Sequence, residues 1–163
     1  MSERARHVLD AMERILNRTI VLFTGTLLFS LAIIIFIQVI FRYVLEDSLS
    51  WSEELTRYMM IWMTFLATGY VVGKRGHSNI DILTSQLSPQ WRLRIDKANS
   101  VLLIVFSCMI VRYGIEFMTY GARQTSSALL IPMHYVYLAI PVGGVLMLFY
   151  AVVILLRQEG TPQ

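Results

Sequence analysis

The sequence contains one cysteine and three histidines in 163 residues, and only 15% of its residues are charged. A lone Cys108 excludes an intrachain disulfide and any C-x-x-C redox or metal motif. The three histidines do not fall in facing apolar segments, as paired haem ligands would. Nucleophile motifs, glycine-rich phosphate loops and zinc-ligand spacings are also missing. We therefore predict no catalytic residue, no cofactor and no metal.

Apolar sequence is what the chain has in abundance. Hydrophobic residues make up 56% of it, and a mean hydropathy of +0.59 lies outside the range of soluble domains. A helix needs about 20 mostly apolar residues to cross a bilayer. Four segments meet that need, at about 19–41, 55–73, 98–118 and 133–156. The first is too long for a cleavable signal peptide and lacks a cleavage site, so we expect it to stay as an anchor.

Basic residues gather on one side of these four spans. They precede the first span, separate the second from the third and follow the fourth, whereas Glu46 and Asp47 lie in the turn after the first span. Because cytoplasmic loops carry the excess of Lys and Arg, both termini are predicted to be cytoplasmic. The basic residues all flank the membrane, so nucleic acid is not an expected partner. The chain thus reads as a single all-α integral membrane domain over residues 1–163.

Amphipathic segments flank the spans. Residues 4–18 carry an apolar stripe at helical spacing, which favours a helix lying on the inner leaflet; a plain extension of the first span is the alternative. Residues 78–97 predict cytoplasmic interfacial helices, the second beginning at Pro89. We expect His77 and Asp81 to organise the inner loop.

The start of the second span is the most informative stretch. Ser50 and Glu53 have the spacing of a capping box, which predicts a helix beginning at Ser50. Charges at this position cost free energy unless they meet headgroups, water or a protein. Helix capping alone is one interpretation and a docking surface is the other. For contacts with a partner and within the bundle we choose Trp51, Glu53, Glu54, Arg57, Tyr58 and Trp62, with Arg42 supporting that end.

The later spans carry two further features. Arg112 and Glu116 are one helical turn apart, and we predict that they form a structural clamp with each other or with Glu54 and Arg57. Pro132 is predicted to open the fourth helix. Pro141, which is followed by two glycines, is predicted to kink it.

No internal repeat is evident, and a self-sufficient transporter usually builds its site from broken helices in repeated halves. The chain therefore looks like a membrane scaffold. Two other classes stay open: a stand-alone oligomeric four-helix exporter, and the membrane-anchor subunit of a redox enzyme.

Several motifs together resemble a known family. They are Phe41-Arg42-Tyr43-Val44, Leu49 to Leu55 with Arg57-Tyr58, Arg75-Gly76-His77 with Asp81, Ile131-Pro132 to Tyr137, and Pro141-Val142-Gly143. In order and spacing they resemble the small, DctQ-type membrane subunit of tripartite ATP-independent periplasmic (TRAP) transporters.

The resemblance implies a role in a three-part importer of the bacterial inner membrane. A periplasmic binding protein would capture an organic anion such as a carboxylate, and a large elevator-type subunit would move it with sodium. The small subunit would bind and steady the large one. Because this chain stops at Gln163, it looks like the separate form of the subunit and not the fused one.

Overall fold

The computed structural model describes residues 3–75 and 89–159, and every regular element in these two ranges is a helix. The only β-type pairing there is an isolated bridge between Thr125 and Pro132. The helices are α1 (Glu3–Tyr43), α2 (Ser50–Arg75), α4 (Pro89–Gly121), α5 (His134–Tyr137) and α6 (Ala139–Glu159). The predicted all-α class is therefore confirmed.

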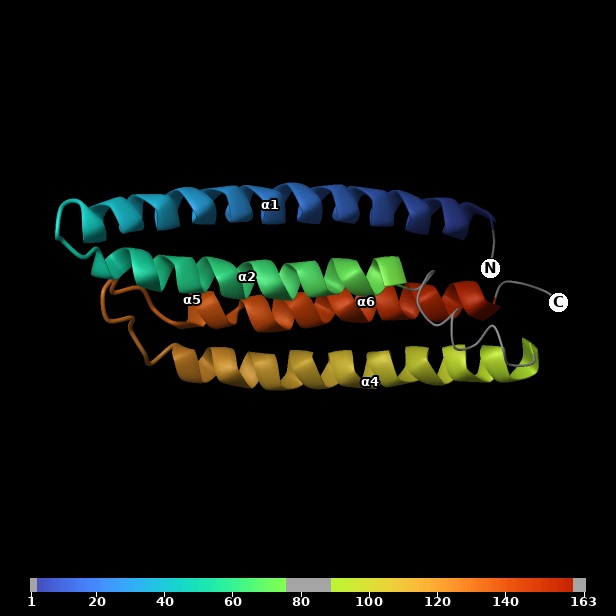
Figure 1. The fold of residues 1–163 in the computed structure, drawn as a ribbon. Helices are drawn as coiled ribbons and strands as arrows, with labels where there is room; N and C mark the ends of the chain where they lie inside the picture. Colours follow the sequence, from blue (N-terminus) through green and yellow to red (C-terminus); the bar gives the residue numbers. More distant parts are fainter. Residues whose placement is uncertain (1–2, 76–88, 160–163) are drawn as a thin grey trace.

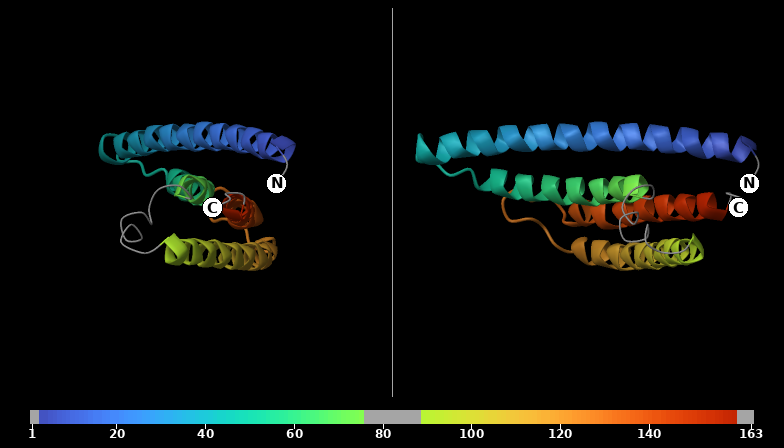
Figure 2. Two further views of the ribbon diagram at one scale, coloured as in Figure 1. Left: turned by 90° about the vertical axis from the view of Figure 1, so that its right-hand side faces the viewer. Right: turned by 45° about the vertical axis from the view of Figure 1, so that its right-hand side comes forward.

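The four long helices run alternately up and down in an elongated bundle (Figure 1). Helix α6 packs between α2 and α4, and α1 packs on α2. Figure 2 shows that α1 and α4 lie on opposite sides of the α2–α6 pair. We call the end with residues 44–49 and 122–133 the loop end. The opposite end, where α1 begins and α6 ends, is the terminal end.

Three stretches of helix in the described part are long and apolar enough to cross a membrane: Leu9–Tyr43, Arg94–Gly121 and His134–Arg157. Helix α2 falls short because Arg57, Thr64, Thr68 and Tyr70 dilute its apolar residues. The fourth span thus stays a prediction, as does the orientation of the termini. Helix α1 has 41 residues, so at about 1.5 Å per residue it is roughly twice as long as a bilayer's hydrocarbon core is thick.

Two predicted helix starts are confirmed, because α2 begins at Ser50 and α4 begins at Pro89. Residues 4–18 are helical but continuous with the first span, and residues 89–97 are continuous with the third. Contact of either segment with the inner leaflet stays a prediction. His77 and Asp81 lie outside the described residues.

Glycines let the helices around α6 approach closely. A Cβ at Gly143 would lie 2.9 Å from the backbone oxygen of Phe65 in α2, and one at Gly69 would lie 2.8 Å from Cβ of Leu146. Small residues of this kind bring backbones together where the hydrophobic effect between helices is weak. A core of Ile20, Leu66 and Tyr150 follows from this packing, with Trp62 against it.

The fourth helical region is divided at Leu138, three residues before Pro141, but Leu138 itself has helical backbone angles (φ −56°, ψ −26°), so a kink stays a prediction. Proline has no N–H, and its ring collides with the carbonyl four residues earlier, which here belongs to Tyr137. Helix α5 ends at Tyr137 and α6 begins at Ala139, so the buried Pro141 lies in the first turn of α6. Pro132 was predicted to open the fourth helix, but α5 begins two residues later, at His134. The carbonyl of Pro132 nevertheless accepts the N–H of Tyr135.

Candidate functional site

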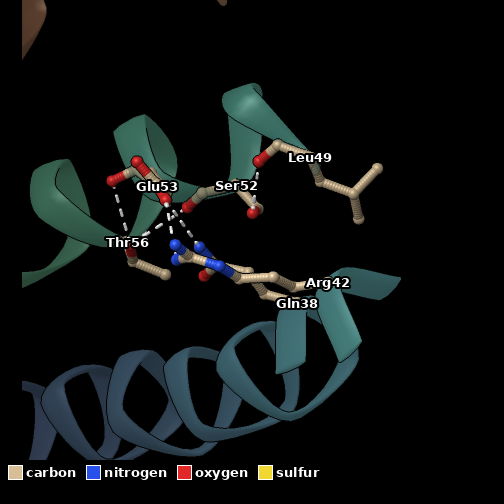
Figure 3. Close-up of polar contacts among 6 residues, drawn as sticks. All are labelled: Gln38, Arg42, Leu49, Ser52, Glu53 and Thr56. Atoms are coloured by element: carbon tan, nitrogen blue, oxygen red, sulfur yellow. Dashed lines mark hydrogen bonds and ion pairs between the residues drawn. The ribbon is translucent and has the colours of Figure 1, made fainter. Parts of the chain in front are cut away.

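The outer turn of α2 is joined to the end of α1 through Glu53. Gln38 Nε2 donates to Glu53 Oε1 at 3.3 Å, and Arg42 Nη1 lies 3.9 Å from the same oxygen (Figure 3). The predicted capping box is wrong, since Glu53 turns to α1 and, among the described residues, the Ser50 side chain has no hydrogen bond. The ion pair between Arg42 and Glu53 is largely exposed, so it contributes at most about 1 kcal/mol to stability.

Hydroxyl groups stabilise the same turn from within. Buried Ser52 donates its Oγ hydrogen to the carbonyl of Leu49 at 2.7 Å. Thr56 Oγ1 lies 3.0 Å from the carbonyl oxygens of both Ser52 and Glu53 (Figure 3). Side chains that bond to nearby backbone in this way satisfy polar groups that the apolar surroundings would otherwise leave unpaired.

Glu54 holds the loop that joins α4 to α5. Its Oε1 accepts the Tyr58 hydroxyl at 2.5 Å and the Ser127 N–H at 3.2 Å. Its Oε2 accepts the N–H groups of Ala128 at 2.9 Å and Leu129 at 2.8 Å. The hydrogen bond from Tyr58 and these three backbone bonds lower the pKa of the Glu54 carboxyl from 4.5 to about 2. Glu54 is therefore ionised at neutral pH and fixes the loop as an acceptor.

The loop held by Glu54 contains one residue, Leu130, in an unusual backbone conformation. Leu130 has a φ of 54° and its side chain is 72% exposed. A left-handed conformation in a residue other than glycine costs about 1 kcal/mol or more and persists only where the surroundings impose it. Two sets of contacts impose it here. Glu54 accepts the N–H groups of the three preceding residues, and Ser126 is hydrogen-bonded to Ile131, the residue that follows.

The other predicted residues at this end divide into two groups. Tyr58 is buried, and its hydroxyl also lies 3.3 Å from Met133 Sδ. Trp62 packs inward on the core. Trp51 and Arg57 are exposed, and in the described residues Arg57 has no ion pair with Glu53 or Glu54. A subunit contact by these residues stays a prediction.

Arg112 and Glu116 are not brought together. Both are exposed on α4, and the described part of the chain contains no ion pair between them or with Glu54 and Arg57. The predicted clamp is therefore wrong. The reason is geometric: both side chains lie on the face of the helix that does not pack on α6.

The sequence argument missed a polar cluster at the terminal end. Arg157 Nη2 lies 2.7 Å from Asp10 Oδ1 and 2.6 Å from Glu13 Oε2. The Tyr150 hydroxyl donates to Asn17 Oδ1 at 2.6 Å. The spacing of residues 10, 13 and 17 places these side chains on one face of α1. That spacing is the feature from which the sequence could have indicated the cluster. The cluster joins α1 directly to α6.

Across residues 3–75 and 89–159, no three His, Cys, Asp or Glu side chains are grouped as metal ligands. The polar groups bind helices and loops to one another. Together with the three long apolar helices, this is the architecture of a multi-span helical membrane protein.

The profile of the family described as tripartite ATP-independent periplasmic transporters, DctQ component, matches residues 31–160. The chain therefore belongs to the DctQ family of TRAP small membrane subunits.

Relatives of known name agree with this assignment. The chain is 26% identical to the sialic acid TRAP transporter small permease protein SiaQ of Vibrio cholerae, covering 86% of this chain and 82% of that protein. It is 34% identical to the C4-dicarboxylate TRAP transporter small permease protein DctQ of Rhodobacter capsulatus, over 63% of this chain and 46% of that protein. It is 30% identical to the sialic acid TRAP transporter permease protein SiaT of Haemophilus influenzae, over 77% of this chain. The chain spans 20% of SiaT's length.

Proposed function

We propose that this chain is the small membrane subunit of a TRAP transporter, which binds and steadies a large elevator-type subunit. The observation that carries the proposal is the family match over residues 31–160. It agrees with a bundle whose polar side chains fasten its own helices and loops together at both ends. The complete transporter would import an organic anion, driven by sodium and supplied by a periplasmic binding protein.

The names of the relatives support a substrate class. SiaQ and SiaT are named for sialic acid, and DctQ is named for C4-dicarboxylates. Both are carboxylates, so we propose a carboxylate as the cargo of the assembled transporter. Selection of the carboxylate would fall to the binding protein and the large subunit.

We also propose that α2 crosses the bacterial inner membrane with the other three long helices. Its position between α1 and α6 supports this, because all four helices run side by side (Figure 1). The loop end would then face the periplasm and both termini the cytoplasm, in line with the basic residues at the terminal end. On this topology the loop held by Glu54 lies where a binding protein approaches.

Purification of the chain in mild detergent or nanodiscs, after expression with its neighbouring genes, tests the proposal. We expect a stable complex with a much larger multi-span protein. A homo-oligomer that moves substrate alone in liposomes would support the exporter class instead. Stoichiometric haem or quinone in the purified protein would support the redox anchor.

A further inference from the structure

The outward face of α4 carries two charges within residues 98–121, a stretch that is otherwise uncharged. Arg112 and Glu116 are exposed, and so are their neighbours Met109 and Tyr113. In the parts of the chain that the structure describes, neither charged side chain has an ion pair or a side-chain hydrogen bond. Whatever satisfies these two charges must therefore lie outside this bundle.

Arg112 lies nine residues before the last residue of α4, so it is not at the end of the helix. A Cβ at Gly114 would lie 2.9 Å from Cγ2 of Ile140, which places Arg112 level with the first turns of α6. Gly143, one turn further along α6, packs against Phe65. Phe65 is past the midpoint of α2, a helix of 26 residues. Arg112 thus lies in the last third of α4, within the part of the helix that packs on α6 and level with the middle of α2.

Lipid is a poor neighbour for such a face. Ionisable side chains within membrane spans almost always face protein or water and pair with one another, because hydrocarbon does not solvate them. Helix α1 provides the contrast within the same chain. Its residues 19–41 contain no charge, and its outward stripe of Leu22, Phe29 and Phe36 suits lipid tails.

A second copy of this chain is a less suitable neighbour. Two copies inserted in the same orientation and packed through α4 by a two-fold axis would place residues of equal height opposite each other. Arg112 would then be level with Arg112 and Glu116 with Glu116, so unlike charges could meet only by reaching across a helical turn. A different polypeptide, with its charges in the complementary order, fits the face better.

We propose that the Arg112–Glu116 face of α4 is the surface through which this chain binds the large membrane subunit. The large subunit would present an acidic group to Arg112 and a cationic or hydrogen-bond donor group to Glu116. Tyr113 and Tyr120, exposed on the same helix, supply the aromatic contacts that protein interfaces favour. This proposal rests on the proposed function, since it names the surface used by the partner inferred there.

Site-specific photocrosslinking tests the face with a matched control. A benzophenone amino acid replaces Tyr113 on α4 or Phe29 on α1, which are aromatic residues of similar exposure, 61% and 70%. The chain is co-expressed with the large subunit and irradiated in native membranes. We expect a crosslink to the large subunit from position 113 and no such crosslink from position 29.

The possible failures are distinguishable. If the unmodified chain does not co-purify with the large subunit, the proposed function fails and this proposal fails with it. If the complex forms but position 113 crosslinks only to lipid or to a second copy, the proposed function stands and the α4 face is wrong. A crosslink to the large subunit from position 29 alone would move the interface to α1.

Charge reversal gives an independent measurement. Arg112→Glu or Glu116→Arg should each reduce the co-purified large subunit roughly tenfold or more, because a desolvated charge would lose its partner. Arg123→Glu, an exposed residue in the loop at 122–133, serves as the control and should leave the complex unchanged. The isolated chain should keep its thermal midpoint in all three variants, since these side chains support no internal contact. Wild-type recovery of the complex in both α4 reversals would overturn the proposal.

Discussion

Helices α1 and α4 lie on opposite sides of the bundle, and each turns one long face away from it (Figure 2). Both faces expose large apolar side chains, such as Phe29 on α1 and Tyr113 on α4. They differ in charge, because the apolar run of α1 has none and α4 carries Arg112 and Glu116. In a membrane protein, exposure of an apolar residue therefore says little about its neighbour. Exposure of a charge within a span is the more informative observation.

The two helices also differ in how they are attached. Glycines place α4 in close contact with α6, and Gly114 leaves no room for a Cβ. Helix α1 packs mainly on α2, and its N-terminal half is also joined to α6 by Arg157 and Tyr150. Helix α4 is thus held by close packing on α6, whereas α1 is joined to α6 by polar contacts in its N-terminal half.

The largest expected effect comes from placing a charge on the α1 face. Phe29→Arg should raise the apparent free energy of inserting α1 by about 2.5–3.5 kcal/mol, since the new side chain would meet hydrocarbon. A glycosylation-mapping insertion assay measures this. Unchanged insertion together with an intact complex would break the comparison, because protein and not lipid would then cover α1.

The next effect contrasts glycines on the two helices. Gly114→Ala should destabilise the purified chain by about 1–3 kcal/mol, because its Cβ would lie 3.0 Å from the backbone nitrogen of Pro141. Gly25→Ala on α1 meets no atom within 4 Å and should stabilise the helix by up to about 1 kcal/mol. Thermal unfolding in detergent compares the two. Equal effects would show that α4 is no more tightly packed than α1.

A smaller effect is expected at the terminal end. The Arg157 side chain is 35% exposed, so its coupling to Glu13 should be about 1 kcal/mol. A double-mutant cycle of Arg157→Gln and Glu13→Gln in thermal unfolding measures that coupling. A coupling of zero would mean that the Arg157–Glu13 pair does not help to hold α1 on α6.

The smallest effect concerns pH at the loop end. Because the pKa of Glu54 is lowered from 4.5 to about 2, its stabilisation of the loop is complete above pH 4.5 and is lost as the pH falls through about 2. Exchange of the Ser127, Ala128 and Leu129 amides should therefore be protected at neutral pH and lose that protection only in strong acid. Glu54→Ala should remove the protection at neutral pH, with exchange roughly tenfold faster. Equal amide exchange in the variant and the wild type would show that Glu54 does not hold the loop.

The sequence predicted the helices better than their contacts. Ser50 and Pro89 begin helices as expected, since local residue preferences decide where a helix starts. A helix boundary near Pro141 was also foreseeable, because proline acts on its own helix. The continuity of α1 was harder to predict, because nothing in residues 4–18 shows that the helix continues unbroken to Tyr43.

Long-range partners were beyond the sequence. Glu54 was expected to make contacts with a partner and within the bundle, but its sequence neighbourhood did not indicate which groups it binds: amides 73 to 75 residues away in the chain. Arg157 was treated only as a topology marker and it pairs with Asp10 and Glu13. Backbone amides have no sequence signature, and a helix face becomes a contact only when the bundle is assembled.

The most direct test of the scaffold account is uptake by proteoliposomes that contain the large subunit, with its binding protein outside and a sodium gradient imposed. Initial rates for sialic acid and for C4-dicarboxylates are compared with and without this chain. The account predicts uptake of one of these carboxylates only when the chain is present, and none by the chain alone. Equal uptake without the chain, or uptake by the chain without the large subunit, would contradict it.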